Sequence, residues 1–381
     1  MRILLFAQHF AEYVLTLAQG FGPEVELMLV LASDNIAGEI PAGMACPLRV
    51  EALAMPGPAR PAQLLAGVLR YRRLLRQFQP DVVHFQEMPK GFSFACWLAS
   101  RAWPRVLTVH DVSSHPGQDA KSSWRQDAIR RHMRASAQAL VLHGQALLEQ
   151  LRRLSPSLAA HAHVVPHPAM RVQRAPTPPA GKSLLFFGRI ARYKGLRPLL
   201  EACLLLQARG QDFELVVAGS GDELEPNRAL LSQVRQLRLL ARRIAPDEID
   251  ALFQQCALVL LPYIEASQSG VAAYALGFGR PCVASRCGSL PEVIRHGHNG
   301  LLCAPGDVQG LADALQSLLN DPARLARFAA QAHALARGEL APQEAARLTL
   351  QLYRRMAPLG ALQLADGPIA EQKPQRQRPG F

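Results

Sequence analysis

Residues 186–195 show the organisation of this chain most clearly and read Phe186-Phe187-Gly188-Arg189-Ile190-Ala191-Arg192-Tyr193-Lys194-Gly195. An apolar run at 183–187 leads into it, and an amphipathic pattern at 195–208 follows it. The pattern predicts a strand, a basic loop and a helix. Gly188 would let the backbone approach a ligand, while Arg189 and Lys194 would place positive charge at a helix N-terminus, where phosphate binds. A basic loop with a glycine cap and no ligand fits the same pattern.

The same alternation of short apolar runs and helical patterns extends in both directions. After residue 195, strands are predicted at 213–218, 257–261 and 281–284, with helices at 195–208, 247–254, 270–278, 307–319 and 322–336. In the first half, the strands are predicted at 2–7, 25–31, 48–53, 81–85, 105–109, 138–142 and 162–166, with helices at 62–78 and 122–135. Continuous apolar runs between helices are typical of parallel strands buried on both faces.

A proline-rich stretch separates the two halves. Residues 166–182 contain five prolines and no apolar period, which indicates a linker. The sequence therefore predicts an α/β protein with two Rossmann-like domains whose parallel sheets face a central cleft. The expected parts are an N-terminal domain at 1–168, a linker at 169–182, a C-terminal domain at 183–340, a helix at 341–358 returning to the first domain, and a disordered tail at 359–381.

Composition limits the class of protein. The chain has 381 residues, 49% hydrophobic and 19% charged, which fits two globular domains. Its net charge of +12 favours an anionic partner, either a phosphate-bearing substrate, an anionic membrane or nucleic acid. Most of the positively charged residues are arginines. An arginine-rich composition is also explained by the base composition of a genome, without any anionic partner. Seven cysteines without ligand spacing indicate free thiols, a reducing compartment and no metal site.

Localisation follows from the apolar runs. The start of the chain is better explained as a first strand than as a signal peptide, and no run of about 18 apolar residues indicates a spanning helix. A cytoplasmic protein is expected, either free or peripheral on the inner face of the membrane.

Two further loops follow predicted strands. Gly219 and Gly221 come after the run at 213–218 and allow either close ligand approach or a tight turn. Ser269 and Gly270 begin the helix at 270–278, where free amides of Gly270 and Val271 can bind phosphate oxygens. Ser269 is also an ordinary N-cap residue, and capping is compatible with phosphate binding.

These elements in this order resemble the GT-B retaining glycosyltransferases of family 4, also called glycosyltransferases group 1. The segments Gly288–Ile294 and Asn299–Leu302 add to the resemblance, which covers residues 184–320 well. It extends more thinly over the first half through Pro80–His84, Thr108–Asp111 and Val164–His167.

The resemblance implies a nucleotide-sugar donor held mainly by the C-terminal domain, retention of stereochemistry, and neither metal nor cofactor. Arg189 and Lys194 match the pair that binds the donor diphosphate, and His110 matches a histidine near the transferred sugar. These three are the expected catalytic residues. The expected donor-binding set is Gly188, Arg189, Lys194, Gly219, Gly221, Ile244, Glu265, Ser269, Gly270, Val271 and Tyr274.

The sequence departs from the family pattern at two places. Tyr274 stands where the second of two glutamates is expected to bind the donor ribose, and a tyrosine cannot accept two hydroxyls as a carboxylate does. The loop at 267–270 resembles a Ser-Gln-Ser-Gly subset of the family with this same loss. The turn after the first strand contains no glycine, so side chains there are expected to act on the acceptor. The expected acceptor-side residues are His9, Phe10, His84 and His115.

The predicted function is transfer of a sugar from a UDP- or GDP-sugar to a glycan or lipid-linked acceptor. A non-catalytic GT-B subunit of a glycan pathway is the alternative, supported by Tyr274 and by the turn without glycine. No basic motif interleaved with aromatics indicates nucleic acid. The basic helices at 62–78 and 125–134 either dock on an anionic membrane or are solvated faces.

Overall fold

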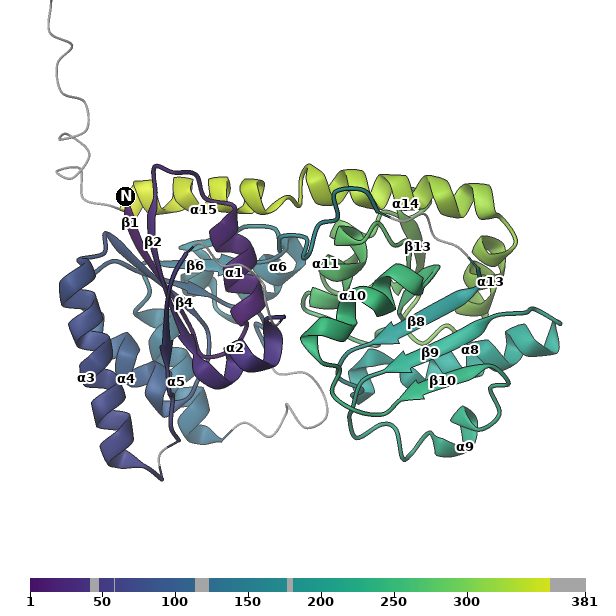
Figure 1. Cartoon of the computed structure of the whole chain (residues 1–381), viewed down its shortest axis with the longest axis horizontal. Coiled ribbons are helices and arrows are strands. Elements are labelled where there is room, and N and C mark those ends of the chain that lie inside the picture. The colour runs from purple at the N-terminus through teal and green to yellow at the C-terminus, as the bar shows by residue number, and fades with distance from the viewer. Residues whose placement is uncertain (42–47, 58, 114–122, 177–180, 357–381) are drawn as a thin grey trace, which may run out of the picture.

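The computed structural model describes residues 1–41, 48–57, 59–113, 123–176 and 181–356, which form two α/β domains side by side (Figure 1). Each domain is built on one sheet whose strands are all parallel. The N-terminal sheet contains β1 (Arg2–Ala7), β2 (Glu26–Ala32), β3 (Arg49–Leu53), β4 (Val82–Gln86), β5 (Arg105–Thr108), β6 (Ala139–Leu142) and β7 (Ala162–Val164). The C-terminal sheet contains β8 (Ser183–Phe187), β9 (Glu214–Ala218), β10 (Leu237–Leu240), β11 (Leu258–Leu261), β12 (Cys282–Ser285) and β13 (Gly300–Cys303).

Helices cover both faces of the N-terminal sheet, whose strand order is β3-β2-β1-β4-β5-β6-β7. In β1, Leu4 and Phe6 pack with α3 (Pro61–Phe78), α4 (Gly91–Ala99) and α5 (Trp124–Ala135). Ile3 and Leu5 point the other way, toward α1 (Ala11–Gln19) and α15 (Pro342–Met356). Because both faces are buried, the strands read as continuous apolar runs. The shorter helices of this domain are α2 (Ser33–Glu39), α6 (Gln145–Leu154) and α7 (Pro156–Ala159).

The C-terminal sheet has the order β10-β9-β8-β11-β12-β13 and is also covered on both faces. Leu184 and Phe186 of β8 pack with α8 (Leu196–Ala208) and α13 (Val308–Leu319), while Leu185 packs with α10 (Pro246–Gln255) and α11 (Gly270–Gly277). The remaining elements are α9 (Arg228–Leu231), α12 (Leu290–Val293), α14 (Pro322–Arg337) and the 3-10 turn η2 (Arg192–Lys194). The prediction of two α/β domains, each built on a parallel sheet, is confirmed.

Most predicted strands and helices lie within two residues of their observed bounds. The strand β10 was not predicted from the sequence. It is an edge strand whose Arg238 and Leu239 are exposed, so its four residues do not form a continuous apolar run. An edge strand that is partly exposed on both faces lacks the signal of a buried parallel strand.

The last helix returns to the first domain. Figure 1 shows α14 above the C-terminal domain and α15 above the N-terminal domain, and α15 packs against α1. Ala346, Leu350 and Tyr353 of α15 are buried in the core of the N-terminal domain. A Cβ on Gly20 would lie 2.1 Å from the carbonyl oxygen of Pro342, so the two segments meet backbone to backbone. The predicted tail at 359–381 lies outside the described residues.

The six cysteines in the described part of the chain are all free, and four of them are buried. Across the same residues, none of the helices is both long enough and apolar enough to span a bilayer.

Candidate functional site

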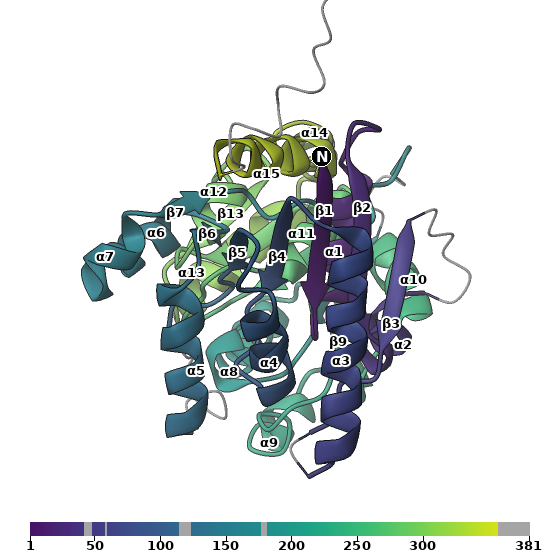
Figure 2. The ribbon, with the colours of Figure 1, turned by 90° about the vertical axis from the view of Figure 1, so that its left-hand side faces the viewer.

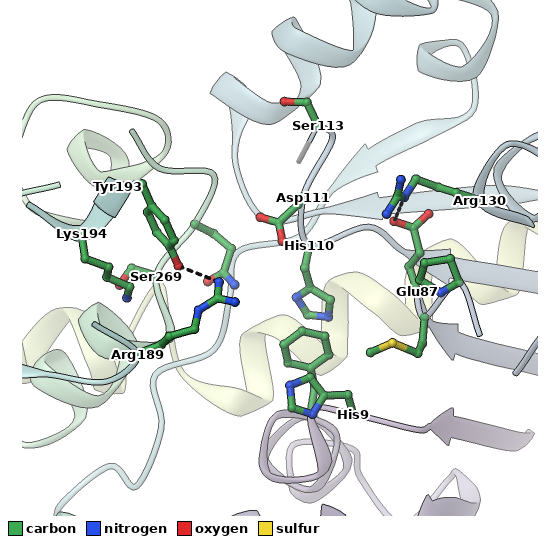
Figure 3. Close-up of a pocket in the computed structure, with 15 residues that line it drawn as sticks. His9, Glu87, His110, Asp111, Ser113, Arg130, Arg189, Tyr193, Lys194 and Ser269 are labelled. Atoms are coloured by element: carbon green, nitrogen blue, oxygen red, sulfur yellow. Dashed lines mark hydrogen bonds and ion pairs between the residues drawn. The ribbon is translucent and has the colours of Figure 1, made fainter. Parts of the chain in front are cut away.

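A cavity of about 550 Å³ lies between the two domains and is lined by both (Figure 3). From the C-terminal domain it takes Arg189, Tyr193, Lys194, Gln268, Ser269 and Gly270. From the N-terminal domain it takes His9, Phe10, Glu87, Met88, Pro89, His110, Asp111, Ser113 and Arg130. Apart from Arg130 of α5, these residues lie in or next to loops that follow the carboxyl ends of parallel strands, which is where open α/β sheets bind ligands.

The loop between β8 and α8 brings two cations to one wall of this cavity. Gly188 has φ 104° and Gly195 has φ 74°, so both adopt backbone conformations that favour glycine. A Cβ on Gly195 would lie 1.9 Å from the carbonyl oxygen of Pro262, which fixes the course of the loop. Lys194 is buried, and its Nζ donates to the Tyr263 hydroxyl at 2.7 Å. Arg189 donates to the Tyr193 hydroxyl at 3.2 Å.

The start of α11 forms the neighbouring part of the wall. Ser269 caps the helix by accepting from the Ala272 amide at 3.2 Å, and its hydroxyl lies 3.2 Å from that of Tyr263. No atom lies within 4 Å of a Cβ built on Gly270, so the helix start opens into space. Free amides and the positive end of the helix dipole therefore face the same cavity as Arg189 and Lys194. This combination suits a ligand with several negative oxygens.

Several residues expected to bind the donor lie outside this cavity. A Cβ on Gly219 would meet the Gly188 oxygen at 1.8 Å, and one on Gly221 would meet the Ile190 oxygen at 2.0 Å. Both glycines are thus required for the loops after β8 and β9 to pack together. Ile244 is buried in the core of the C-terminal domain. Glu265 and Val271 also do not line the cavity, although Val271 packs 3.5 Å from the Cβ position of Gly188.

Tyr274 is held by the N-terminal domain. Its hydroxyl donates to the Glu12 carboxylate of α1, a short contact between residues 262 positions apart. Arg171 also binds Glu12, through Nε at 2.6 Å and Nη2 at 3.2 Å, and reaches Asp250 of α10 at 2.5 Å. We call Glu12, Arg171, Asp250 and Tyr274 the domain-bridging network. In this arrangement the Tyr274 hydroxyl is used to join the domains.

His110 lines the cavity, but its ring nitrogens point into the protein. Nε2 lies 2.9 Å from Oε1 of Gln86, and Nδ1 is buried without a hydrogen-bond partner. Phe10 stacks on the ring with centroids 4.0 Å apart. Burial, with the neighbouring histidines adding to it, lowers the pKa of His110 well below its ordinary value. His110 is therefore a neutral imidazole that is covered by Phe10 on one face, with Nε2 occupied by Gln86 and Nδ1 buried.

The other expected acceptor-side residues divide between the cavity and the core. His9 and Phe10 line the cavity, and Phe10 has φ 68°, so the turn takes a left-handed conformation without glycine. The prediction that His84 lines the cleft is wrong. His84 is buried within β4, where it bonds to Thr108 at 2.7 Å and to the Tyr353 hydroxyl of α15. His115 lies outside the described residues.

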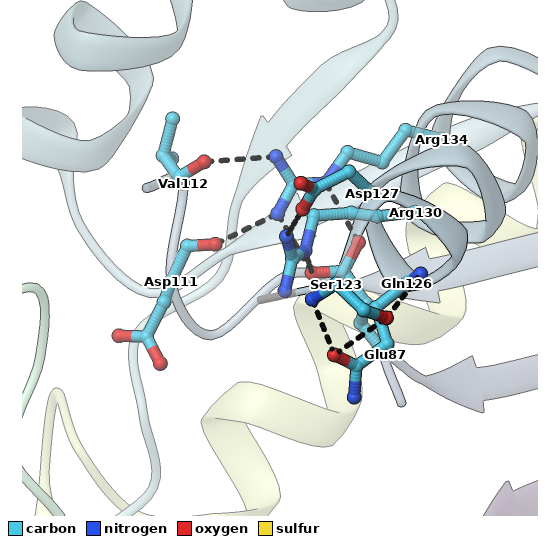
Figure 4. A network of polar contacts seen from close by, with 8 residues as sticks. All are labelled: Glu87, Asp111, Val112, Ser123, Gln126, Asp127, Arg130 and Arg134. Carbon is cyan, nitrogen blue, oxygen red and sulfur yellow. Dashed lines mark hydrogen bonds and ion pairs between the residues drawn. The ribbon is translucent and has the colours of Figure 1, made fainter. Parts of the chain in front are cut away.

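An ion-pair network supports the wall of the cavity that belongs to the N-terminal domain (Figure 4). It was not predicted from the sequence. Arg134 of α5 binds both oxygens of Glu87, at 2.6 and 2.7 Å, and donates to the carbonyl oxygens of Asp111 and Val112. The loop after β5 is thereby fixed to α5, and Figure 3 shows the Asp111 carboxylate pointing into the cavity. Glu87 and Arg134 are 47 positions apart, and no local motif joins them.

Comparison with known proteins identifies the family. The description "Glycosyl transferases group 1" matches residues 181–321, and "Glycosyl transferase 4-like domain" matches residues 10–168. The chain belongs to the group 1 glycosyltransferases.

Relatives of known name support this assignment. The glycosyltransferase is 28% identical over 315 residues to a glycogen synthase of Mycobacterium tuberculosis, covering 77% of this chain and 73% of that one. It is 28% identical over 341 residues to a D-inositol 3-phosphate glycosyltransferase of Catenulispora acidiphila, covering 81% and 78%. Sucrose-phosphate synthase of Thermosynechococcus elongatus has the same fold, with a TM-score of 0.72 at 15% identity over 93% of this chain and 99% of that one.

Lys194 of this glycosyltransferase has an unusual acidity. Burial, followed by repulsion from Arg189, lowers the pKa of its ammonium group to about 7, while Asp111 across the cavity opposes the shift. Burial makes the ammonium form costly, and Asp111 only partly offsets that cost, so the free enzyme is expected to hold Lys194 partly neutral at neutral pH. An anionic ligand beside Nζ would favour the charged form.

We therefore expect ligand binding to take up a proton. Affinity for a nucleotide sugar, whose diphosphate diester does not titrate near pH 7, should be constant below pH 7. The affinity should fall as the pH rises above 7, by at most about tenfold per pH unit. Above that pH Lys194 must take up one proton each time the ligand binds. Calorimetry at pH 8 in buffers of different ionisation enthalpy measures this proton directly.

Asp111 provides the matched control. Asp111→Asn removes the carboxylate that opposes the shift, so the pKa of Lys194 should fall further and the affinity should begin to decrease at lower pH. An affinity that does not change between pH 6 and pH 9, or binding at pH 8 without proton uptake, would contradict the assignment of Lys194 to the ligand.

Proposed function

We propose that this glycosyltransferase transfers a sugar from a nucleoside-diphosphate donor to a glycan or lipid-linked acceptor. The observation that carries the proposal is the convergence of Arg189, Lys194 and the α11 N-terminus on one cavity. Each of these groups favours phosphate, and together they suit a diphosphate, whose negative charge grows as the glycosidic bond breaks.

The proposed roles divide between the two domains. Arg189 and Lys194 bind the diphosphate and stabilise it as it leaves, with the amide of Gly270 donating to its oxygens. Glu87, Asp111 and Arg130 line the opposite wall, where the acceptor would enter. Closure of the two domains around the cavity would exclude water and bring the acceptor hydroxyl to the anomeric carbon. Retention of stereochemistry is part of this proposal and is supported only by the resemblance to the family.

A uridine donor is the first candidate to test. The Anabaena protein Alr3699/HepE has been solved in complex with UDP-glucose, and its TM-score to this chain is 0.68 at 18% identity, over 93% of this chain and 99% of that one. Likeness at this level shows the fold alone, so the choice of UDP over GDP rests on the experiment below.

Thermal unfolding with a panel of UDP- and GDP-sugars tests the donor. A true donor at 100 times its dissociation constant should stabilise the protein by about 2.7 kcal/mol, and hydrolysis of that donor without acceptor should follow. If no nucleotide sugar stabilises the protein, the proposal fails. Binding without hydrolysis or transfer to any acceptor would favour a binding subunit in place of an enzyme.

A further inference from the structure

The outer layer of the N-terminal domain has an uneven distribution of charge. Figure 2 shows α3, α4 and α5 side by side on the face of the sheet that points away from the C-terminal domain, and α4 contacts both neighbours. The helix α3 contains four arginines and no acidic residue, and α4 contains no charged residue. The one acidic residue of α5, Asp127, is paired with Arg130 at 2.8 Å. The layer is strongly basic and offers few carboxylates to solvent.

The same layer exposes large apolar side chains. Leu65 and Leu69 of α3 are 59% and 51% exposed, and Trp124 at the start of α5 is 74% exposed. Leu65, Leu69, Arg72 and Arg76 follow one another at steps of three or four residues, so they lie along one stripe of the helix. The opposite side of α3 packs inward, since a Cβ on Gly67 would meet Phe92 of α4 at 2.7 Å.

The apolar end of this layer lies toward the cavity. Helices that follow parallel strands begin at the carboxyl edge of the sheet, which is the edge that faces the cleft. Leu65 lies in the second turn of α3, and Trp124 is the first residue of α5, so both lie near that edge. Arg130 of the same helix α5 lines the cavity. The helix α5 thus contains both the exposed Trp124 and Arg130, which lines the N-terminal side of the cavity.

We propose that the outer face of α3 and α5 docks on an anionic phospholipid bilayer. Leu65, Leu69 and Trp124 would enter the headgroup region, and the exposed arginines would pair with lipid phosphates. These arginines are Arg72, Arg73, Arg76, Arg125 and Arg131. In this orientation the acceptor wall lies close to the membrane, where a lipid-linked acceptor presents its headgroup. The orientation argument, though not the docking itself, rests on the proposed function.

The combination of side chains favours a bilayer over nucleic acid. Nucleic acid would use the arginines, but it offers no apolar layer for two leucines on a helix surface. An interfacial helix uses both kinds of residue, with the apolar side chains inserted and the basic ones at phosphate level. The bilayer therefore accounts for the leucines as well as the charge.

Co-sedimentation of the full chain with vesicles tests the proposal. Binding should be strong with phosphatidylcholine–phosphatidylglycerol vesicles and weak with phosphatidylcholine alone. The double variant Arg72→Gln/Arg76→Gln should bind about 25-fold more weakly, at roughly fivefold per arginine. The triple variant Leu65→Gln/Leu69→Gln/Trp124→Gln should also lose binding by at least about tenfold, because apolar insertion is removed.

Matched controls lie in the C-terminal domain. Leu239 is 41% exposed on β10, and Arg228 is exposed on α9, so Leu239→Gln and Arg228→Gln should bind vesicles as the native chain does. The proposal is overturned if these control variants lose as much vesicle binding as the α3 and α5 variants do. It is also overturned if binding does not depend on phosphatidylglycerol, or if the protein binds DNA and not vesicles.

Donor binding in solution is a separate measurement. Vesicle binding without nucleotide-sugar binding would defeat the proposed function and leave the docking surface intact.

Discussion

Replacing Lys194 with methionine is expected to lower kcat/KM for the nucleotide-sugar donor by about 100- to 1000-fold, the loss typical of a group that stabilises developing negative charge. Lys194 is linked to the start of α11, because both Lys194 and Ser269 bond to the Tyr263 hydroxyl. Methionine keeps most of the apolar stem and removes the charge. Steady-state kinetics and donor titration measure the effect.

The variant should fold as well as the native chain. Burial disfavours the ammonium form of Lys194, so removing it leaves no unpaired charge behind. Arg192 is the matched control, because it lies in the same turn η2 but is exposed and does not line the cavity. Arg192→Met should change kcat/KM by less than about threefold. If the two variants behave alike, the loop does not act on the donor through Lys194.

Replacing Glu12 with glutamine is expected to destabilise the protein by about 3 kcal/mol, in the range for breaking one side of a buried ion pair. The side chains of Glu12 and Arg171 are each 6% exposed, so the change leaves the Arg171 guanidinium buried with Asp250 as its remaining carboxylate. Tyr274 also loses its acceptor carboxylate. Urea unfolding, with the transition of each domain followed separately, measures the loss.

An exposed pair supplies the comparison for this prediction. Glu344 and Arg347 contact at 2.5 Å on α15, with side chains 33% and 53% exposed, so Glu344→Gln should cost less than about 1 kcal/mol. A double-mutant cycle of Glu12→Gln with Tyr274→Phe should show coupling, since each removes one side of the same hydrogen bond. Additive losses, or a Glu12→Gln cost no larger than that of Glu344→Gln, would show that the domain-bridging network does not hold the domains together.

The network also changes the interpretation of Tyr274. The sequence places a tyrosine where a ribose-binding carboxylate is expected. The structure instead shows a carboxylate of the N-terminal domain bonded to that tyrosine. At this position of α11 the tyrosine side chain thus serves a contact between the two domains.

Features that depend on local order could be predicted from the amino-acid sequence. Strand bounds, the two-domain class and the loops holding Arg189, Lys194 and Ser269 follow from apolar runs, glycines and helix starts, because each is set by residues close together in the chain. Which polar groups remain available to a ligand depends on long-range packing and could not be predicted from local patterns. His84 has the sequence context of a cleft residue, yet Tyr353, 269 positions later, occupies its ring nitrogen. The burial of His110 beneath Phe10 and the pairing of Tyr274 with Glu12 have the same origin, since a buried polar group bonds to whichever partner packing brings near.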